Sequence, residues 1–297
     1  MTLTTSAYPG WRSLLFIPVH IDKFVEKAAS RGADAYILDL EDSVPLAEKE
    51  SARRKVIAAA RQVSAQGAAA LVRINLNTQL AVKDIEASVS PEVAALVIPK
   101  VESAAQVKLI ADLIDQHETD KGMVKGRTRL IAMIESVEAL PHLDAIASAS
   151  PRLLSITLGS EDFSASAGMA PIPEALMLPN QMIVYACRRA GLYPLGFPAS
   201  IADYSDLEAF GKTIRLARNL GFVGALCIHP KQAEILNREF LPSRKEIEQA
   251  RGLIEAYEIG IAEGKGAVEY NGKMIDLPVV KRAMEMIVTW ETFQHPH

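Results

Sequence analysis

The sequence has 297 residues, and its 32 basic and 36 acidic side chains give a formal net charge of −4. Hydrophobic residues make up 49% of the chain, which is enough to bury a sizeable core and excludes a disordered protein. The mild acidity argues against a dedicated nucleic-acid-binding protein, because such a protein would carry a basic stripe.

Eight apolar runs of strand length follow one another at fairly even intervals. Most of them are continuous rather than alternating, which is typical of strands buried on both faces of a parallel sheet. The runs are 12–19, 35–40, 70–75, 95–100, 129–135, 153–159, 192–198 and 222–230.

Segments with helical periodicity separate these runs. The clearest are 21–31, 46–66, 104–117, 136–148 and 203–220. The last begins at Asp203, a residue type that often caps a helix N-terminus. A strand followed by a helix, repeated eight times, predicts the α/β class and favours a closed TIM (β/α)₈ barrel over residues 1–241.

The remaining residues, 242–297, exceed what a barrel needs. A helical pattern over 243–262 is followed by Asn271-Gly272, which is a strong signal for a two-residue hairpin turn. A last helical pattern covers 279–293. We therefore expect a C-terminal helix–hairpin–helix appendage, which is a candidate for docking on a neighbouring subunit.

In a barrel of this kind the chemistry lies at the carboxyl ends of the strands. Glu135 ends the fifth run, and Asp162 follows the sixth. Two carboxylates on adjacent strands suit a hard divalent cation, above all Mg²⁺, which keeps several waters and takes substrate oxygens. The alternative is that each carboxylate only caps the helix that follows it.

Arg73 lies within the third run, in the block LVRIN. A buried arginine needs an anionic partner. Asp39 or Glu41, at the end of the neighbouring run, can serve, and so can a substrate carboxylate held by the guanidinium fork. Both kinds of partner remain open from the sequence.

Two further features at strand ends are candidates for substrate contact. The backbone N–H groups of Glu161 and Asp162 follow Gly159-Ser160 at a helix start, where an oxyanion can be received. His229 ends the eighth run and precedes a proline, so it either contacts substrate or only forms a turn.

Six blocks, in this order, resemble the citrate lyase β-subunit-like (CitE-like) family. The blocks are RSLLFIPVHIDKFVEKAASRGADAYILDLEDSV, LVRIN, LVIPKVES, IAMIESVEAL, LGSEDF and GFVGALCIHPKQ. The resemblance covers about residues 12–285. It implies a TIM barrel, a Mg²⁺ ion and a trimer, or a hexamer made from trimers. The implied reaction is the reversible carbon–carbon cleavage of a 3-hydroxy-3-carboxyacyl-CoA, such as citramalyl-, malyl- or citryl-CoA, into an acyl-CoA and a 2-oxo acid.

The resemblance also implies roles for individual residues. Glu135 and Asp162 match the metal ligands, and Arg73 matches the residue that binds the carboxylate of the 2-oxo acid. Asp276, in GKMIDLP, resembles an acid/base aspartate that family lyases supply from an adjacent subunit. Arg12, at the start of the first block, is grouped with the substrate-binding residues.

We expect the acidic block DLEDSV to hold these residues in position. Asp39, Glu41 and Asp42 match the family block, and we expect them to orient Arg73 and metal-bound waters. In the related class II pyruvate aldolases the similar block ends in Glu-His. Here Asp42 follows Glu41, which favours the thioester lyase.

Two other functions remain as alternatives. One is a metal-dependent aldolase acting on free 2-oxo or hydroxy acids, and the other is a subunit of a lyase complex that acts on an acyl-carrier thioester. The chain departs from the family pattern at Val19 and Asn180, in segments on the acyl-carrier side of the site. These departures are what keep the alternatives open.

The expected location is the cytoplasm. The N-terminus shows no signal-peptide pattern, and no run of ~18 apolar residues could span a membrane. We expect small-molecule partners, coenzyme A as part of the substrate and a homo-oligomer, with no nucleic acid and no membrane.

Overall fold

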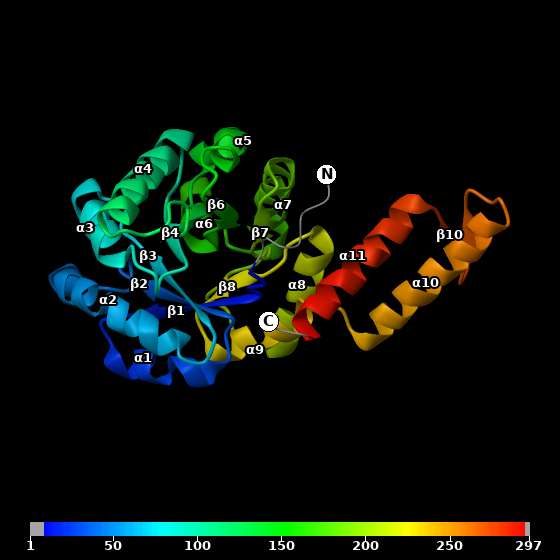
Figure 1. Cartoon of the computed structure of the whole chain (residues 1–297), viewed down its shortest axis with the longest axis horizontal. Helices are drawn as coiled ribbons and strands as arrows, with labels where there is room; N and C mark the ends of the chain where they lie inside the picture. The colour runs from blue at the N-terminus through cyan, green and yellow to red at the C-terminus, as the bar shows by residue number, and fades with distance from the viewer. Residues whose placement is uncertain (1–8, 295–297) are drawn as a thin grey trace. The chain divides into compact units, whose positions relative to one another are not determined.

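The computed structural model of this chain describes residues 9–294, which Figure 1 draws in full colour. They form two compact units, and the division falls after Phe240. The first unit holds an eight-stranded sheet and the helices around it. The second holds two long helices joined by a hairpin.

The sheet of the first unit is parallel throughout. Its strands are β1 (Ser13–Pro18), β2 (Ala35–Asp39), β3 (Ala69–Arg73), β4 (Ala95–Ile98), β5 (Arg129–Ile134), β6 (Leu153–Leu158), β7 (Tyr193–Leu195) and β8 (Ala225–Cys227). Each strand pairs with the next from β1 to β7, and β8 pairs with β1. A single parallel bridge between Leu195 and Gly224 joins the two remaining edges. The predicted barrel is therefore confirmed.

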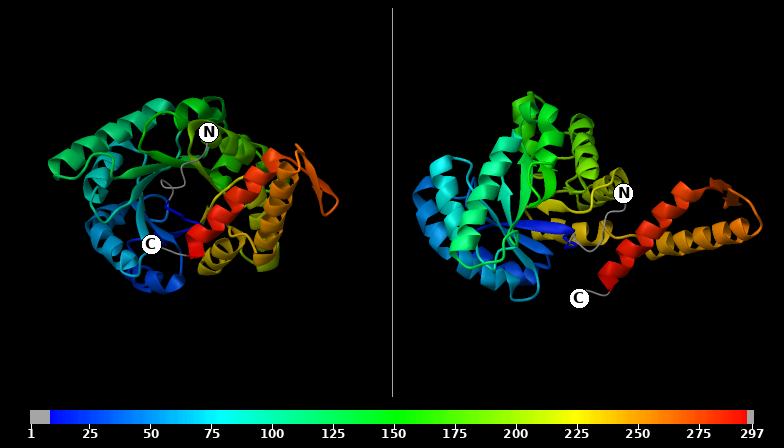
Figure 2. Two further views of the ribbon diagram at one scale, coloured as in Figure 1. Left: turned by 45° about the vertical axis from the view of Figure 1, so that its right-hand side comes forward. Right: turned by 45° about the horizontal axis from the view of Figure 1, so that its top comes forward.

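Helices surround this sheet, as the two views in Figure 2 show. They are α1 (Asp22–Ala28), α2 (Lys49–Ser64), α3 (Thr78–Ser88), α4 (Ala104–Asp120), α5 (Leu143–Ala147), α6 (Ser160–Ala167), α7 (Pro173–Ala190), α8 (Leu207–Leu220) and α9 (Pro230–Glu239). Short 3₁₀ turns occupy Ala29–Arg31, Leu46–Glu48 and Val137–His142. Among the described residues, no helix combines the length and the apolar character needed to cross a membrane.

Two of the helix predictions need correction at their boundaries. The helix predicted from Asp203 begins at Leu207, and its N-cap is Asp206, whose Oδ1 accepts hydrogen bonds from the backbone amides of Glu208 and Ala209 at 3.0 and 2.9 Å. Asp203 instead accepts from Ser205 within the preceding loop. The pattern over 136–148 divides into a 3₁₀ turn and the short α5, because Pro141 lies inside it.

The continuous apolar runs are explained by two separate buried clusters. One contains Leu14, Ile37, Leu71 and Leu226 and draws its members from the strands and their flanking residues, so it fills the barrel interior. The other joins the alternate strand residues to helix residues such as Val56. Each strand therefore buries both of its faces, which is why period-two alternation is absent from its sequence.

The second unit consists of α10 (Arg244–Ala262), β9 (Val268–Tyr270), β10 (Lys273–Ile275) and α11 (Leu277–Gln294). The two strands pair antiparallel. Asn271 and Gly272 join them with φ values of 50° and 73°, as the predicted two-residue turn requires. The predicted helix–hairpin–helix appendage is therefore present.

Two glycines of α10 allow the hairpin to pack closely on the helix. A Cβ added to Gly260 would overlap the side chain of Val268, and one added to Gly252 would overlap the Tyr270 hydroxyl. Val268 and Tyr270 are two residues apart on β9, so both face the same side of the strand. Both glycines of α10 thus leave room for side chains on the same face of β9.

We expect the substitution Gly260→Ala to loosen the hairpin. The overlap with Val268 forces the strand away from α10, at a cost of about 1–3 kcal/mol. Hydrogen exchange of the amides in β9 and β10 should then become faster. Gly266→Ala is the control, because an added Cβ there meets nothing within 4 Å. Equal protection in the two variants would show that the close approach is not needed.

Candidate active site

A pocket of about 310 Å³ opens at the carboxyl ends of the barrel strands. Seven of the eight strands, or the residues directly after them, contribute to its wall. The residues that line it are Phe16, Pro18, Asp39, Ser43, Arg73, Met133, Thr157, Leu158, Gly159, Ser160, Glu161, Asp162, Gly196, Phe197, Ala199, Ile201, Leu226 and Ile228. Arg73 and Asp162, two of the predicted site residues, therefore share one pocket wall.

Arg73 is held by the acidic block that follows β2. Asp39 and Arg73 are register partners at the ends of β2 and β3, so their side chains lie side by side. The Arg73 Nε and one terminal nitrogen each donate to an Asp39 oxygen at 2.7 Å. The other terminal nitrogen lies 3.1 Å from Glu41 Oε2. The guanidinium is also 4.7 Å from the centre of the Phe16 ring, a cation–π distance.

These contacts set the charge states of the pair. Burial alone would raise the pKa of Asp39, but the hydrogen bonds and charge of Arg73 outweigh it, so the pKa of Asp39 is lowered. Burial disfavours the charged guanidinium as well, yet Asp39 and Glu41 raise the pKa of Arg73 above its ordinary value. Both groups are therefore ionised, and the protein partners that the sequence suggested for Arg73 are present. The guanidinium has five N–H groups, and these three contacts use three of them, so two N–H groups remain.

Lys100 joins the same network, although sequence reasoning did not assign it to the site. Its Nζ lies 2.7 Å from Glu41 Oε1 and 3.6 Å from Asp42 Oδ1. The φ of Lys100 is 52°, in the left-handed region that costs a non-glycine residue roughly 1–2 kcal/mol. Despite the charge of Lys100, burial raises the pKa of Glu41. Strain of this kind in a network of charges is typical of functional sites.

A layer of buried polar groups supports the loop behind Glu41. Asn75, directly after β3, donates from Nδ2 to the carbonyl of Leu40 at 2.7 Å and to Asp84 at 2.6 Å. Asp84, which is fully buried on α3, pairs in turn with Arg53 of α2 at 2.5 Å. This chain of contacts ties two outer helices to the loop that carries the acidic block.

Glu135 leaves β5 directly into this end of the barrel and is 4% exposed. Its Oε1 is buried and has no hydrogen-bond partner among the described residues. Burial, followed by the charges of Asp162 and Glu41, raises the pKa of Glu135 to about 8. Gly159 lies against it, and a Cβ added there would come within 2.6 Å of Glu135 Cγ. A glycine at the end of β6 is therefore required for the Glu135 side chain to occupy its position.

These observations fit a divalent cation beside Glu135 and Asp162. A buried carboxylate oxygen without a partner, repelled by a second carboxylate, is stabilised by a cation placed between the two. Within residues 9–294 no group of three or more His, Cys, Asp or Glu side chains is arranged to hold a metal ion. The pair could supply two carboxylate ligands, and Mg²⁺ is commonly bound in proteins by one or two carboxylates and waters.

Two other predicted residues lie at the same end of the barrel, and each forms a hydrogen bond within the chain. Glu161 lines the pocket, and its Oε1 accepts from Ser200 Oγ at 2.6 Å. His229 follows β8 as the N-cap of α9, where its Nδ1 accepts from the Lys231 amide at 3.2 Å. Its ring stacks on Tyr204 at 4.6 Å between centres. His229 is not among the residues that line the pocket within the described chain.

Arg12, which the sequence analysis groups with the substrate-binding residues, does not line the pocket within the described chain. Arg12 comes just before β1 and therefore lies at the amino ends of the strands, opposite the pocket. Its guanidinium pairs with Asp34, just before β2, at 2.7 and 2.8 Å, and also donates to the carbonyl of Asn237. Residues at this end of a barrel serve stability rather than catalysis.

Asp276 belongs to the second unit, between β10 and α11. It is half-buried, and its Oδ1 accepts from the Val279 amide at 3.4 Å while its carbonyl accepts from Val279 and Val280. Asp276 is therefore placed to cap α11.

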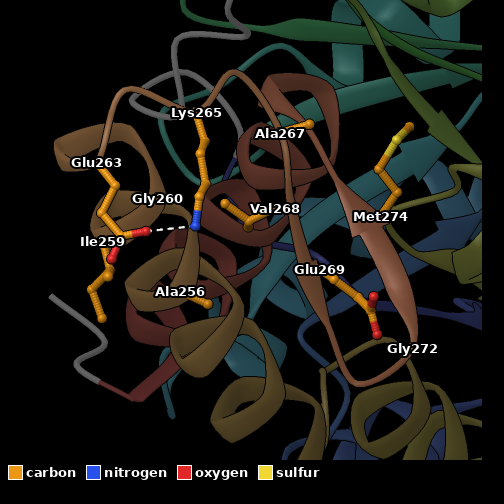
Figure 3. A pocket seen from close by; sticks show the side chains of 10 residues that line it. All are labelled: Ala256, Ile259, Gly260, Glu263, Lys265, Ala267, Val268, Glu269, Gly272 and Met274. Atoms are coloured by element: carbon orange, nitrogen blue, oxygen red, sulfur yellow. Dashed lines mark hydrogen bonds and ion pairs between the residues drawn. The ribbon is translucent and has the colours of Figure 1, made fainter.

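The second unit also contains a hollow of about 750 Å³ between α10 and the hairpin (Figure 3). Lys265 and Glu263 form an ion pair of 2.6 Å beside it. Ile259 and Met274 line it and are 57% and 72% exposed.

Comparison with known proteins identifies the family. The profile of the HpcH/HpaI aldolase/citrate lyase family matches residues 12–230. The chain belongs to this family. The citrate lyase subunit beta of Leuconostoc mesenteroides subsp. cremoris is 35% identical over 279 residues, which cover 93% of this chain and 92% of that protein. The L-malyl-CoA/beta-methylmalyl-CoA lyase of Rhodobacter capsulatus is 36% identical over 300 residues, covering 93% of each.

A solved structure of the HpcH/HpaI family agrees with the fold. CitE from Mycobacterium tuberculosis, in complex with magnesium, acetoacetate and coenzyme A, superposes with a TM-score of 0.76 at 26% identity. The match covers 96% of this chain and 100% of that one. The predicted family and the predicted lyase class are thus confirmed.

Proposed function

We propose that this chain is a Mg²⁺-dependent carbon–carbon lyase that cleaves a 3-hydroxy-3-carboxyacyl-CoA into an acyl-CoA and a 2-oxo acid. The observation that carries the proposal is the unpartnered buried oxygen of Glu135, whose charge interacts with that of Asp162. Asp162 lines the pocket together with Arg73, and Glu135 lies outside the lining residues. The relatives named for citrate and malyl-CoA cleavage, and the relative solved with magnesium and coenzyme A, support the same chemistry.

In this proposal Glu135 and Asp162 hold the metal and Arg73 holds the substrate carboxylate. A metal bound there would act as a template and as a Lewis acid for the hydroxyl and carboxylate oxygens of the substrate. The two guanidinium N–H groups that bond to neither Asp39 nor Glu41 would donate to the carboxylate. Because Arg73 is itself fixed by Asp39, it directs cleavage to one carbon–carbon bond.

The bond broken joins the hydroxyl-bearing carbon to the carbon next to the thioester. The hydroxyl loses its proton to solvent, and its oxygen becomes the carbonyl oxygen of the 2-oxo acid. The electron pair of the broken bond moves to the thioester α-carbon, which gains a proton. Asp276 donates that proton, and in the reverse direction it removes one from the acyl α-carbon. No oxidant or reductant is needed.

We further propose that the appendage docks on a neighbouring subunit and delivers Asp276 there, in a trimer or a hexamer. The exposed apolar residues Ile259 and Met274, around the hollow of Figure 3, support such a docked surface. The substitution Met274→Glu should then lower the oligomer mass measured by light scattering. An unchanged mass together with unchanged turnover would contradict docking through this face.

Val19 and Asn180, where the sequence departs from the family pattern, are both buried and do not line the pocket within the described chain. Asn180 donates instead to the Leu176 carbonyl on its own helix at 2.9 Å. Neither departure therefore contributes a side chain to the lining of the pocket.

Lys100 should act as a positioning residue for Arg73 through Glu41. We expect Lys100→Met to raise the KM for the 2-oxo acid about tenfold, because loss of one half-buried ion pair is worth ~1.4 kcal/mol. Lys100→Arg keeps the charge and should stay within about threefold of wild type. Steady-state kinetics in the condensing direction measure both values. Equal KM values in the two variants would contradict the role.

The test of the proposed function is a release assay. Purified protein, with and without Mg²⁺, is given malyl-CoA and citramalyl-CoA, and the formation of 2-oxo acid is followed. We expect Mg²⁺-dependent release from at least one thioester. Release from the free hydroxy acids alone would support a metal-dependent aldolase, and release only from an acyl-carrier thioester would support a complex subunit. Either outcome would overturn the coenzyme A assignment.

A further inference from the structure

We infer that Lys49 is a positioning residue for Arg73. Lys49 is the first residue of α2, and within the described chain it does not line the pocket. It acts instead on the acidic turn, residues 40–43, which follows β2 and carries Glu41 and Asp42. The inference rests on the proposed function for one point, the identity of the carboxylate that Arg73 binds.

The Lys49 ammonium binds two successive carbonyl groups of the acidic turn. Its Nζ donates to the carbonyl oxygens of Leu40 and Glu41, at 2.8 Å each. These contacts reach back nine and eight residues along the chain, so they close the loop between β2 and α2. Hydrogen bonds from a charged donor are roughly twice as strong as neutral ones. Lys49 therefore fixes the backbone where the acidic side chains leave it.

Arg73 depends on this turn for its ionic partners. The Glu41 carboxylate lies 3.1 Å from the guanidinium, and it belongs to a residue whose carbonyl Lys49 binds. Asp39 holds the guanidinium at 2.7 Å, and its Oδ1 also accepts from the Glu41 amide at 3.0 Å. A displacement of the acidic turn therefore moves both carboxylates relative to Arg73.

Lys49 also lies among negative charges. Burial is the largest influence on the pKa of Lys49 and lowers it, while four carboxylates act in the opposite direction. They are Asp39, Glu41, Asp42 and Asp84. Removal of the ammonium would increase the repulsion among these groups, and the turn can relieve that repulsion by moving.

The two carbonyls have other donors, so loss of Lys49 should loosen the turn without unfolding it. The Leu40 carbonyl also accepts from Asn75 Nδ2 at 2.7 Å, and the Glu41 carbonyl also accepts from the Val44 amide at 3.0 Å. Each carbonyl keeps one donor when Lys49 is replaced, so neither is left without a partner. The main consequence is a less fixed acidic turn.

Lys121 provides a matched control. It follows α4, and its Nζ also donates to two backbone carbonyls, those of Glu86 at 2.5 Å and Val89 at 2.8 Å. Burial lowers the pKa of Lys121 as well. Lys121 precedes β5 and therefore lies towards the amino ends of the strands, opposite the pocket. The substitution Lys121→Met thus removes the same kind of contact and leaves the acidic turn intact.

The first measurement follows the Arg73 guanidinium itself. Its Nε–H donates to Asp39 at 2.7 Å, so it exchanges with solvent when that pair opens. The full chain is labelled with ¹⁵N-arginine, and the Arg73 signal is assigned by its absence from Arg73→Lys. We expect Lys49→Met to speed this exchange about tenfold, because charged hydrogen bonds no longer hold the turn. Lys121→Met should stay within about threefold of the wild type, and so should Lys49→Arg, which keeps the charge and several donors.

The second measurement uses the proposed reaction. Glyoxylate and pyruvate are each condensed with acetyl-CoA in the presence of Mg²⁺. The acyl α-carbon loses a proton and bonds to the carbonyl carbon, whose oxygen gains a proton. We expect Lys49→Met to raise the KM for the oxo acid about tenfold and to change kcat less than about threefold, because Arg73 binds the carboxylate and transfers no proton. Lys49→Arg should restore the KM, and Lys121→Met should leave it unchanged.

The outcomes separate the inference from the proposed function. Equal Arg73 exchange rates in Lys49→Met and Lys121→Met would overturn the inference, whatever happens to turnover. Faster exchange in Lys49→Met with an unchanged KM would overturn the assignment of the carboxylate to Arg73, which belongs to the proposed function. No condensation by the wild type would overturn the proposed function, and the exchange rates would still decide the inference. If Lys49→Met fails to fold, Lys49→Gln is compared with Lys121→Gln by the same two measurements.

Discussion

Asp276→Asn should lower turnover by ~10²–10⁴-fold while Mg²⁺ binding stays at its wild-type level. The amide cannot donate a proton to the thioester α-carbon or remove one from it. Asparagine is nearly as good a helix N-cap as aspartate, so the hydrogen bond from the Val279 amide is retained. The change therefore removes the acid and keeps the cap. Release of 2-oxo acid and calorimetric Mg²⁺ titration measure the two effects.

The matched control for this experiment is Asp206→Asn. Asp206 is also an aspartate at a helix N-cap, on α8, and accepts from the amides of Glu208 and Ala209. If Asp276 acted only as a cap, the two variants would show the same small change in melting temperature and in turnover. Turnover of Asp276→Asn equal to that of Asp206→Asn would therefore exclude the acid/base role.

The barrel was predictable because its strands are buried on both faces. Continuous apolar runs identify such strands without any knowledge of long-range contacts, and their order in the chain equals their order around the barrel. The residues that follow the apolar runs then lie at one end of the barrel. This reasoning placed Arg73 and Asp162 correctly at the pocket wall. It would also have excluded Arg12, which precedes its strand.

Other features depend on geometry that a sequence does not display. Lys100 reaches Glu41 from a backbone with a positive φ, and nothing in Pro99-Lys100 signals that conformation. The N-cap of α8 was misplaced because Asp203 and Asp206 are the same residue type three positions apart. The helix α7 was not predicted, and it contains Pro179, a residue that usually marks a helix boundary.

Glu135 should make Mg²⁺ binding strongly dependent on pH. Its pKa of about 8 means that the carboxyl is mostly protonated at neutral pH when no metal is bound. A metal must displace that proton, so the affinity for Mg²⁺ should rise by up to about tenfold per pH unit below pH 8 and level off above it. Calorimetric titrations between pH 6 and pH 9 measure this slope.

The substitution Glu135→Gln should abolish the slope and weaken Mg²⁺ binding by about a hundredfold or more, because a ligand and its titrating proton are both removed. Glu234→Gln, on the exposed face of α9, should keep the wild-type profile. Wild-type affinity in the Glu135 variant would refute metal ligation by this residue, whatever the variant does to turnover.

The same pKa predicts how the metal-free protein responds to pH. Because the folded-state pKa of Glu135 lies above the value near 4.5 expected for an unfolded chain, its contribution to stability is complete below pH 4.5 and is lost as the pH rises through about 8. The melting temperature of metal-free Glu135→Gln should therefore exceed that of the wild type at pH 8, and the difference should shrink towards pH 5. Saturating Mg²⁺ should reverse the order at pH 8, since the wild type binds the metal more tightly and therefore gains more stability from it. If Mg²⁺ left the melting temperature of the wild type unchanged at pH 8, the buried carboxylate of Glu135 would not serve to bind Mg²⁺.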